Sequence, residues 1–154
     1  MEQDKPRKTV ATNRKARHDY EIIDVIEAGI ELQGSEVKSL RQAKVSFKDS
    51  FAQISRGEVI LHNLHIAPYD KASHYAHDPE RKRRLLIHRI QIRRLQAASE
   101  QDGMTLVPLS IYFKGPYAKV ELAVARGKRK YDKRAAMAQR EADLHIRRAY
   151  RGKS

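Results

Sequence analysis

The sequence predicts a mainly β protein: a small OB-like antiparallel β-barrel with two or three short helices and a basic C-terminal tail. Its 154 residues suffice for one domain with tails. Apolar and polar side chains alternate over residues 107–114 and again over 119–124, the period of a strand with one buried face. Turn signals such as Arg56-Gly57 separate further short segments rich in β-branched residues. Because sequence does not fix the order of the strands, an SH3-like barrel is the alternative.

The N-terminal half is predicted to contain an arm and three strands. Residues 1–12 are polar and charged without periodicity, so we expect a disordered arm, with the barrel spanning residues 13–126. Residues 18–28 are rich in aromatic and β-branched side chains and predict the first strand. Residues 51–55 and 58–66 predict two more strands, which the Arg-Gly turn joins into a hairpin.

A short helix is expected over residues 36–42, where Ser35 can cap the first turn. Two apolar residues three positions apart would face the core, and two cations with the same spacing would face outward. The core-facing pair is Val37 and Leu40, and the outward pair is Lys38 and Arg41.

The C-terminal half is predicted to contain a loop, a helix and a hairpin. Residues 68–79 are polar and predict a loop. A helix is expected over residues 88–98, before the stop signal at Gly103. The two alternating segments flank Gly115 and predict an antiparallel hairpin.

The chain after residue 126 differs in composition from the barrel. A Gly-punctuated basic run over 126–130 predicts a linker, and residues 132–150 are rich in helix formers. Their apolar stripe is mostly alanine, which buries too little area to hold a helix against the core. We therefore expect the tail, 127–154, to be mobile when free and helical when bound to RNA.

Charge gives the strongest indication of function. The net charge is +13, and residues 126–154 hold eleven basic and three acidic side chains. Residues 81–94 hold seven basic side chains and no acidic one. Such an excess favours a polyanionic partner, because each phosphate contact releases counterions. A membrane surface would require a long amphipathic helix with bulky apolar anchors, which the sequence lacks.

Other classes of protein are disfavoured by what the sequence does not contain. There is no cysteine, so disulfides, thiolate metal sites and thiol catalysis are excluded. No apolar run reaches the roughly 18–20 residues that span a bilayer. Of the seven histidines, His62 and His65 lie three apart on a predicted strand and would point to opposite faces, so a zinc site is disfavoured. We expect no cofactor and no catalytic activity, and a cytoplasmic monomer.

Four segments together resemble the SsrA-binding protein family. They run in family order along nearly the whole chain: residues 13–20 (NRKARHDY), 27–41 (EAGIELQGSEVKSLR), 78–86 (DPERKRRLL) and 127–134 (GKRKYDKR). The second segment is long and unusual enough to be specific, whereas a basic run like the fourth would be weak by itself.

The resemblance implies an OB-like barrel that binds the tRNA-like domain of tmRNA near its elbow and D-arm. Barrel and RNA would together imitate a tRNA in the vacant decoding site of a stalled ribosome, while the tail enters the empty messenger channel as a helix. The implied partners are the small ribosomal subunit, alanyl-tRNA synthetase and the tRNA-delivering elongation factor. The implied outcome is tagging of the incomplete protein and release of the ribosome.

The resemblance also implies which residues contact RNA. On the barrel they are Asn13, Glu27 and Leu86, with Lys38 and Arg41 in the same signature, and in the tail they are Gly127, Lys128, Asp132, Lys133 and Arg134. Tyr131 stands where many relatives carry a histidine that stacks on a decoding-centre base; a tyrosine ring can also stack but cannot carry positive charge. Further cations expected at RNA phosphates are Arg17, Arg83, Arg84 and Arg129.

Alternatives remain open for these residues and for the function. Taken without the resemblance, Glu27 is an exposed carboxylate at a strand end, Leu86 is a core residue and Asn13 is a capping residue. The second function to consider is a basic protein of the small ribosomal subunit. The third, an RNA nuclease or modification enzyme, needs a clustered catalytic set that the sequence does not offer.

Overall fold

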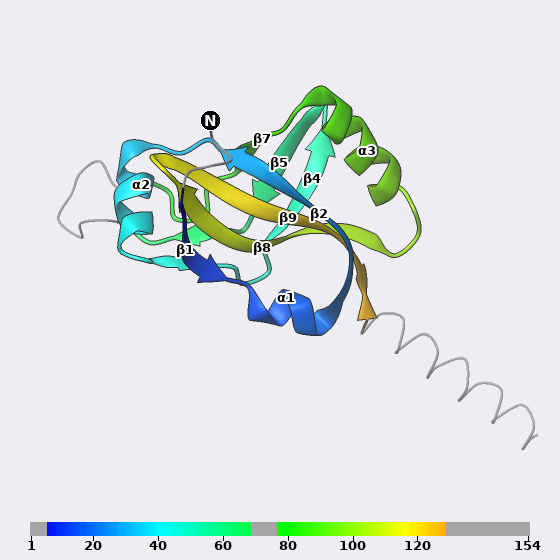
Figure 1. Cartoon of the computed structure of the whole chain (residues 1–154), viewed down its shortest axis with the longest axis horizontal. Coiled ribbons are helices and arrows are strands. Elements are labelled where there is room, and N and C mark those ends of the chain that lie inside the picture. The colour runs from blue at the N-terminus through cyan, green and yellow to red at the C-terminus, as the bar shows by residue number, and fades with distance from the viewer. Residues whose placement is uncertain (1–5, 69–76, 129–154) are drawn as a thin grey trace, which may run out of the picture.

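The computed structural model describes residues 6–68 and 77–128, and it is built mainly of antiparallel strands with three helices outside them (Figure 1). In chain order the elements are β1 (Arg7–Thr12), α1 (Arg14–Asp19), β2 (Tyr20–Ile30), α2 (Gly34–Arg41), β3 (Val45–Ser46), β4 (Phe51–Ser55), β5 (Glu58–His62), β6 (His65–Ile66), β7 (Arg83–Leu86), α3 (Arg89–Ser99), β8 (Met104–Lys114) and β9 (Tyr117–Gly127).

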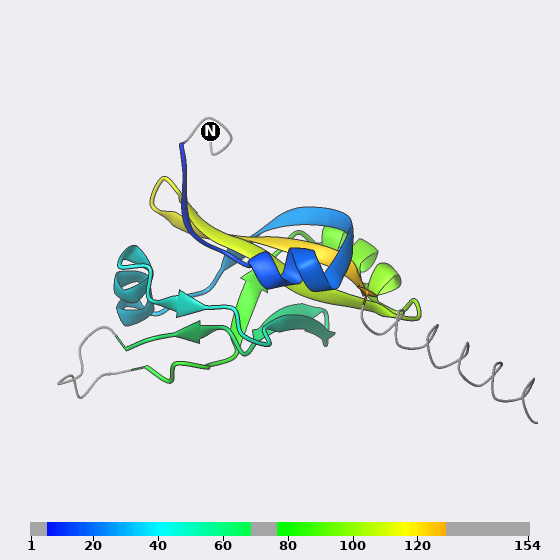
Figure 2. The same cartoon turned by 90° about the horizontal axis from the view of Figure 1, so that it is seen from below.

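The main sheet curls into a ring. Its strand order is β1-β8-β4-β5-β7-β2-β9, and a long β8–β9 pairing links the two ends, so that β1 flanks the ring. Figure 2 shows β8 and β9 in one layer and β4 and β5 in the other. The β4–β8 seam has a single residue pair, Ala52 with Leu106, so the ring is not closed as a barrel. The prediction of a mainly β, OB-like architecture is confirmed.

The core inside the ring is aliphatic. Its fully buried members include Leu61, Leu64, Leu106 and Leu122. α2 faces the core as predicted, with Leu40 buried and Val37 packed against the core, while Lys38 and Arg41 are exposed. The helix begins earlier than expected, however. Gln33 is the N-cap, and it forms a reciprocal capping box with Glu36, which leaves Ser35 inside the helix.

β8 is buried on both faces, whereas its alternating pattern had predicted one face exposed to solvent. A bulge between Pro108 and Ser110 reverses the direction of the side chains that follow. Leu109 therefore joins a small outer cluster with Ala16 of α1, and Ile111 joins the main core. The pattern was wrong about exposure because α1, which was not predicted, covers the outside of β8.

The N-terminal segment also differs from its prediction. Residues 7–12, expected to be disordered, form β1, which pairs with β8 from Arg7 opposite Lys114 to Thr12 opposite Ser110. Only Val10 and Ala11 of this strand pack against the core, and they are adjacent in sequence, so hydrophobic periodicity could not predict it. β2 begins at Tyr20, because residues 14–19 form α1.

The other predicted elements agree closely with the structure. The hairpins β4–β5 and β8–β9 and the helix α3 lie within a few residues of their expected bounds. The predicted strand 58–66 is interrupted at Asn63, whose φ of 62° turns the chain between β5 and β6. The predictions for Arg129, Tyr131, Asp132, Lys133, Arg134 and the rest of the tail lie outside the described residues.

Candidate nucleic-acid interface

The outer face of β7, β2, β9 and β8 gathers several predicted site residues. The register places Leu86 of β7 opposite Gly29 of β2, Gly29 opposite Lys119 of β9, and Lys119 opposite Tyr112 of β8. Residues that are directly opposite in a sheet share a face, and Glu27 lies on the same face two residues before Gly29. We call this surface, defined by Glu27, Leu86, Tyr112 and Lys114, the outer sheet face.

Leu86 is exposed on the outer sheet face and does not belong to the core. Its relative exposure is 49 %, although an isolated leucine is more often a core residue. A Cβ at Gly29 would lie 3.2 Å from the Cβ of Leu86. The absence of a side chain at Gly29 therefore leaves room for Leu86 to pack across β2.

Glu27 is held in place by two partners from β8. The hydroxyl of Tyr112 donates a short hydrogen bond to one carboxylate oxygen, and Nζ of Lys114 lies 3.3 Å from both oxygens. Burial raises the pKa of Glu27, but the bonds from Tyr112 and Lys114 outweigh it, so the pKa lies below its ordinary value. The carboxylate is thus ionised at neutral pH, and it keeps capacity for a further donor such as a base amino group.

Tyr112 connects Glu27 to Arg7, and Glu121 connects Arg7 to Arg17. Burial, followed by its bond to Glu27, raises the pKa of the Tyr112 hydroxyl, which remains a donor. The guanidinium of Arg7 lies 3.6 Å above the centre of its ring and also bonds to Glu121 at 2.9 Å. Arg17 reaches the same carboxylate at 3.1 Å and is half exposed. The structure therefore brings the predicted Arg17 close to the outer sheet face.

Sequence reasoning missed Arg7, Tyr112 and Lys114 as members of this site. Arg7 was assigned to a disordered arm, and the alternating pattern of β8 gave no indication that Tyr112 pairs with a carboxylate 85 positions away. The available signal was the β8–β9 hairpin itself, because it places β8 two strands from β2 in an antiparallel sheet.

The outward cations of α2 lie near the same end of β8. Arg41 is exposed, with its guanidinium 5.9 Å from the ring centre of Phe113, the residue beside Lys114. It lines a cleft of about 610 Å³ between α2 and β1, together with Lys8. Lys38 is exposed on the same helix. These side chains could extend contact with a polyanion around the end of the ring.

Asn13 has the capping role that the sequence left open. Its Oδ1 accepts from the N–H of Ala16 at 3.2 Å, and its Nδ2 donates to the carbonyl of Pro108 at 2.8 Å. Both ends of the amide are therefore used to start α1 and tie it to β8. RNA contact by Asn13 stays a prediction.

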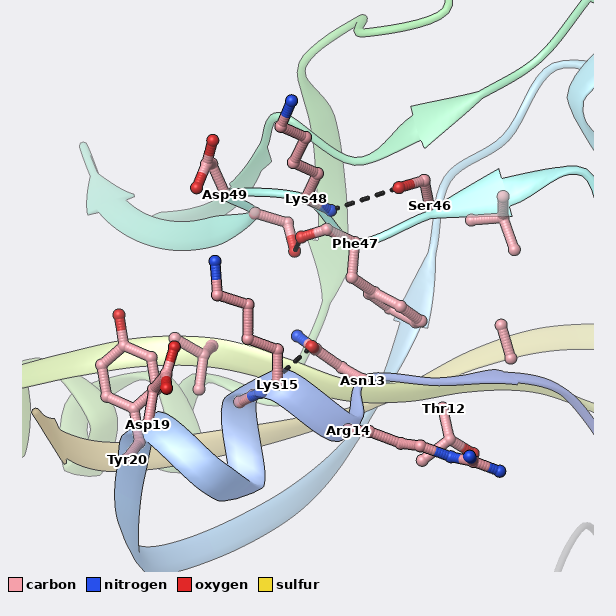
Figure 3. A pocket seen from close by; sticks show the side chains of 15 residues that line it. Thr12, Asn13, Arg14, Lys15, Asp19, Tyr20, Ser46, Phe47, Lys48 and Asp49 are labelled. Atoms are coloured by element: carbon pink, nitrogen blue, oxygen red, sulfur yellow. Dashed lines mark hydrogen bonds between the residues drawn. The ribbon is translucent and has the colours of Figure 1, made fainter. Parts of the chain in front are cut away.

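A pocket of about 460 Å³ lies beside Asn13, between α1 and the segment 45–50 (Figure 3). Lys15 extends from α1 toward the segment that carries Phe47 and Lys48, and Tyr20 lines the α1 side. The pocket mixes cations with carboxylates and aromatic rings, and no single ligand chemistry stands out from its lining.

Arg83 was predicted to contact RNA, and this prediction is wrong. The side chain is fully buried, and it donates to the carboxylate of Glu36 and to the carbonyl of Leu64 at 2.6 Å. Arg81 donates to the same carboxylate at 2.6 Å. Burial raises the pKa of Glu36, but the bonds from Arg81, the Gln33 N–H and Arg83 keep it below its ordinary value. A count of charges along residues 81–94 missed this partner because Glu36 lies 47 positions from Arg83.

Arg84 is half exposed and bridges two carboxylates. It contacts Glu31 at 3.0 Å and Glu58 at 3.2 Å, and the bond to Glu58 is the main reason that its pKa is raised. Carboxylates from other parts of the chain therefore neutralise part of the positive charge of residues 81–94. Phosphate contact by Arg84 stays a prediction.

The described residues end at the start of the predicted tail site. Gly127 is the last residue of β9 and lies opposite Tyr20, and Lys128 follows it. Over the described ranges, no three His, Asp or Glu side chains are grouped so that they could hold a metal ion. None of the described helices is long and apolar enough to cross a membrane.

An OB-like sheet with an exposed leucine, an ionised carboxylate and flanking arginines, in a chain of net charge +13, is typical of a nucleic-acid-binding domain. Comparison with known proteins narrows this class. The family model described as SmpB protein matches residues 10–152, and the chain belongs to this family.

Curated relatives and a solved structure agree with that assignment. The chain is 54 % identical over 144 residues to the SsrA-binding protein of Geobacillus thermodenitrificans, covering 94 % of this chain and 93 % of the relative. It is 52 % identical over 149 residues to that of Desulforudis audaxviator, covering 97 % of each. A solved chain from "tmRNA-SmpB: a journey to the center of the bacterial ribosome" is 58 % identical, with a TM-score of 0.67, covering 77 % of this chain and 83 % of that one.

Proposed function

We propose that this chain binds the tRNA-like domain of tmRNA and delivers it to stalled ribosomes as an adaptor of trans-translation. The observation that carries the proposal is the family match over residues 10–152, which spans both the barrel and the basic tail. The relatives named SsrA-binding protein support it, as does the 58 % identical solved structure that pairs tmRNA with SmpB at the ribosome.

In this proposal the barrel supplies recognition. Structured RNA is recognised mainly by its shape and backbone, so an exposed face with fixed side chains suits it. Glu27 accepts hydrogen bonds from base amino groups, and Leu86 packs against an unstacked base or a ribose. Arg17, Arg84 and the α2 cations Lys38 and Arg41 contact phosphates around this face.

The tail supplies a second RNA contact on the ribosome. Its motif offers Lys128, Arg129, Lys133 and Arg134 to ribosomal RNA phosphates, with Tyr131 as the stacking ring. The tail folds as a helix in the messenger channel of the small subunit. Alanyl-tRNA synthetase and the elongation factor join the complex through tmRNA. The chain acts in the cytoplasm as a monomer, by binding and without a chemical step of its own.

Competition binding at physiological salt tests this proposal. Labelled tRNA-like domain of tmRNA is bound to the full chain and challenged with excess tRNA and with random RNA of equal length. Non-specific contacts weaken steeply with salt, so retention of the tmRNA fragment against both competitors is the expected result. Equal displacement by all three RNAs would leave a basic RNA binder and favour the small-subunit ribosomal protein instead.

A further inference from the structure

A groove of about 720 Å³ runs between α3 and the β4–β5 turn. Its floor includes Leu86 and Ile87, and its α3 wall carries Arg89, Ile92 and Arg93. The opposite wall carries Arg56 of the turn. Figure 1 shows α3 lying beside the strands β4, β5 and β7 that form this side of the ring.

The charges of the groove favour an anionic occupant. Four arginines line it, namely Arg56, Arg84, Arg89 and Arg93, against the single carboxylate of Glu58. Glu58 is already bonded to Arg84. Among the described residues, neither Arg89 nor Arg93 has a carboxylate within salt-bridge distance, and both side chains are exposed.

The arrangement of the cations fits a chain of phosphates. Arg89 and Arg93 are four residues apart on α3, so they form a row along one side of the helix. Guanidinium groups bind phosphate through two parallel hydrogen bonds. Ile92 lies between them in sequence and offers apolar contact to sugars or bases.

The groove is also continuous with the outer sheet face. Leu86 belongs to both surfaces, because it lines the groove and lies opposite Gly29 of β2. We propose that an RNA segment continues past Leu86 into this groove, with Arg89 and Arg93 contacting its phosphates. This inference rests on the proposed function for the identity of the RNA, and it assigns the α3 cations of the basic segment 81–94 to a defined groove.

The test compares neighbouring arginines on α3. Arg93 lines the groove whereas Arg94 does not, and both are exposed. Binding of the full chain to the tRNA-like fragment is measured over a range of salt for Arg93→Gln, Arg89→Gln/Arg93→Gln and the matched control Arg94→Gln. Melting temperatures verify that each variant is folded, and Arg93→Lys restores the charge without the guanidinium.

Each lost phosphate contact lowers the slope of log affinity against log salt by about 0.7 to 0.9, and it weakens binding roughly four- to fivefold near physiological salt. We expect one such step for Arg93→Gln, two for the double variant, little change for Arg94→Gln and a largely restored slope for Arg93→Lys. Equal losses in the Arg93 and Arg94 variants, or an unchanged slope in the double variant, would overturn the inference.

The wild-type chain separates this failure from a failure of the proposed function. If wild type prefers the tmRNA fragment over tRNA and the double variant binds like wild type, only the groove contact is wrong. If wild type shows no preference while the slopes differ as expected, the groove binds RNA but the adaptor function is wrong.

Discussion

Replacement of Arg83 by methionine should destabilise the fold without removing a direct RNA contact. Arg83 is fully buried, and its guanidinium donates to Glu36 and to the carbonyls of Leu64 and Pro79. Methionine fills much of the space but removes the guanidinium from these acceptors, and Glu36 then keeps only Arg81 and the Gln33 N–H. Removing one partner of a buried ion pair costs about 3–5 kcal/mol, a large part of the roughly 5–15 kcal/mol that holds a domain together.

Urea unfolding followed by circular dichroism gives the free energy of unfolding for this variant. The matched control is Arg84→Met, because Arg84 is the next residue and its ion pairs are exposed, where such pairs contribute about 0–1 kcal/mol. Adding Glu36→Leu to Arg83→Met should recover part of the loss, since an apolar pair replaces a buried carboxylate that keeps only Arg81 and the Gln33 N–H as donors.

RNA binding measured well below the unfolding transition decides between the two roles of Arg83. We expect Arg83→Met to bind nearly as well as wild type once its folded fraction is taken into account. Unfolding free energy within about 0.5 kcal/mol of wild type, together with a clear loss of RNA affinity, would refute the structural role.

Three further predictions concern Glu36, Tyr112 and the tail. Because the pKa of Glu36 is lowered from 4.5 in the fold, its contribution to stability is present above about pH 4.5 and lost as the pH falls through the lowered value. The free energy of unfolding of Glu36→Gln should therefore depend less on pH in this range than that of wild type. Identical pH dependence in acid unfolding of the two proteins would contradict this. Tyr112→Phe should weaken tmRNA binding severalfold in filter binding, because a hydrogen bond to a charged group contributes about 1.5–3 kcal/mol when buried and less at a part-exposed carboxylate. Glu27→Ala should weaken binding at least as much with the barrel still folded. Wild-type affinity in Glu27→Ala would return Glu27 to a plain surface carboxylate. Deletion of residues 129–154 keeps the β-sheet pair between Gly127 and Tyr20. The affinity for tmRNA should therefore be largely retained, while tagging on stalled ribosomes is abolished. Loss of most of the tmRNA affinity would refute this division of roles between barrel and tail.

The elements that sequence predicted well are those specified by local signals. The β8–β9 hairpin follows from alternation around Gly115, and α3 follows from apolar spacing and its stop signal. β1 and α1 were missed because their stability comes from β8, about a hundred positions away, and not from patterns of their own. Both are therefore results of tertiary pairing.

The residues of the candidate site also divide into those that local motifs predicted and those that depend on tertiary contacts. Leu86, Arg17 and Glu27 were proposed from motifs, and the structure places them on or near one face. The sequence could not predict which arginine of residues 81–94 is buried, because the burial of Arg83 depends on its ion pair with Glu36 of α2. For the partners of Glu27 the sequence indicated the β8–β9 hairpin but not the pairing of β2 with β9, which brings Glu27 within reach of β8.

The single residue pair between β4 and β8 separates two parts of the sheet that differ in how extensively their strands are paired. β2, β8 and β9 are joined by long continuous ladders, whereas the β4–β5 hairpin is attached to β8 by Ala52 and Leu106 alone. We therefore expect the hairpin, whose turn carries Arg56, to open more readily than the strands that carry Glu27 and Tyr112, because its remaining ladder is the three pairs of β5 with β7. An RNA ligand would then meet a preorganised outer sheet face beside a more mobile β4–β5 hairpin. The sheet face would set the affinity, and the hairpin would set how widely RNA shapes are tolerated.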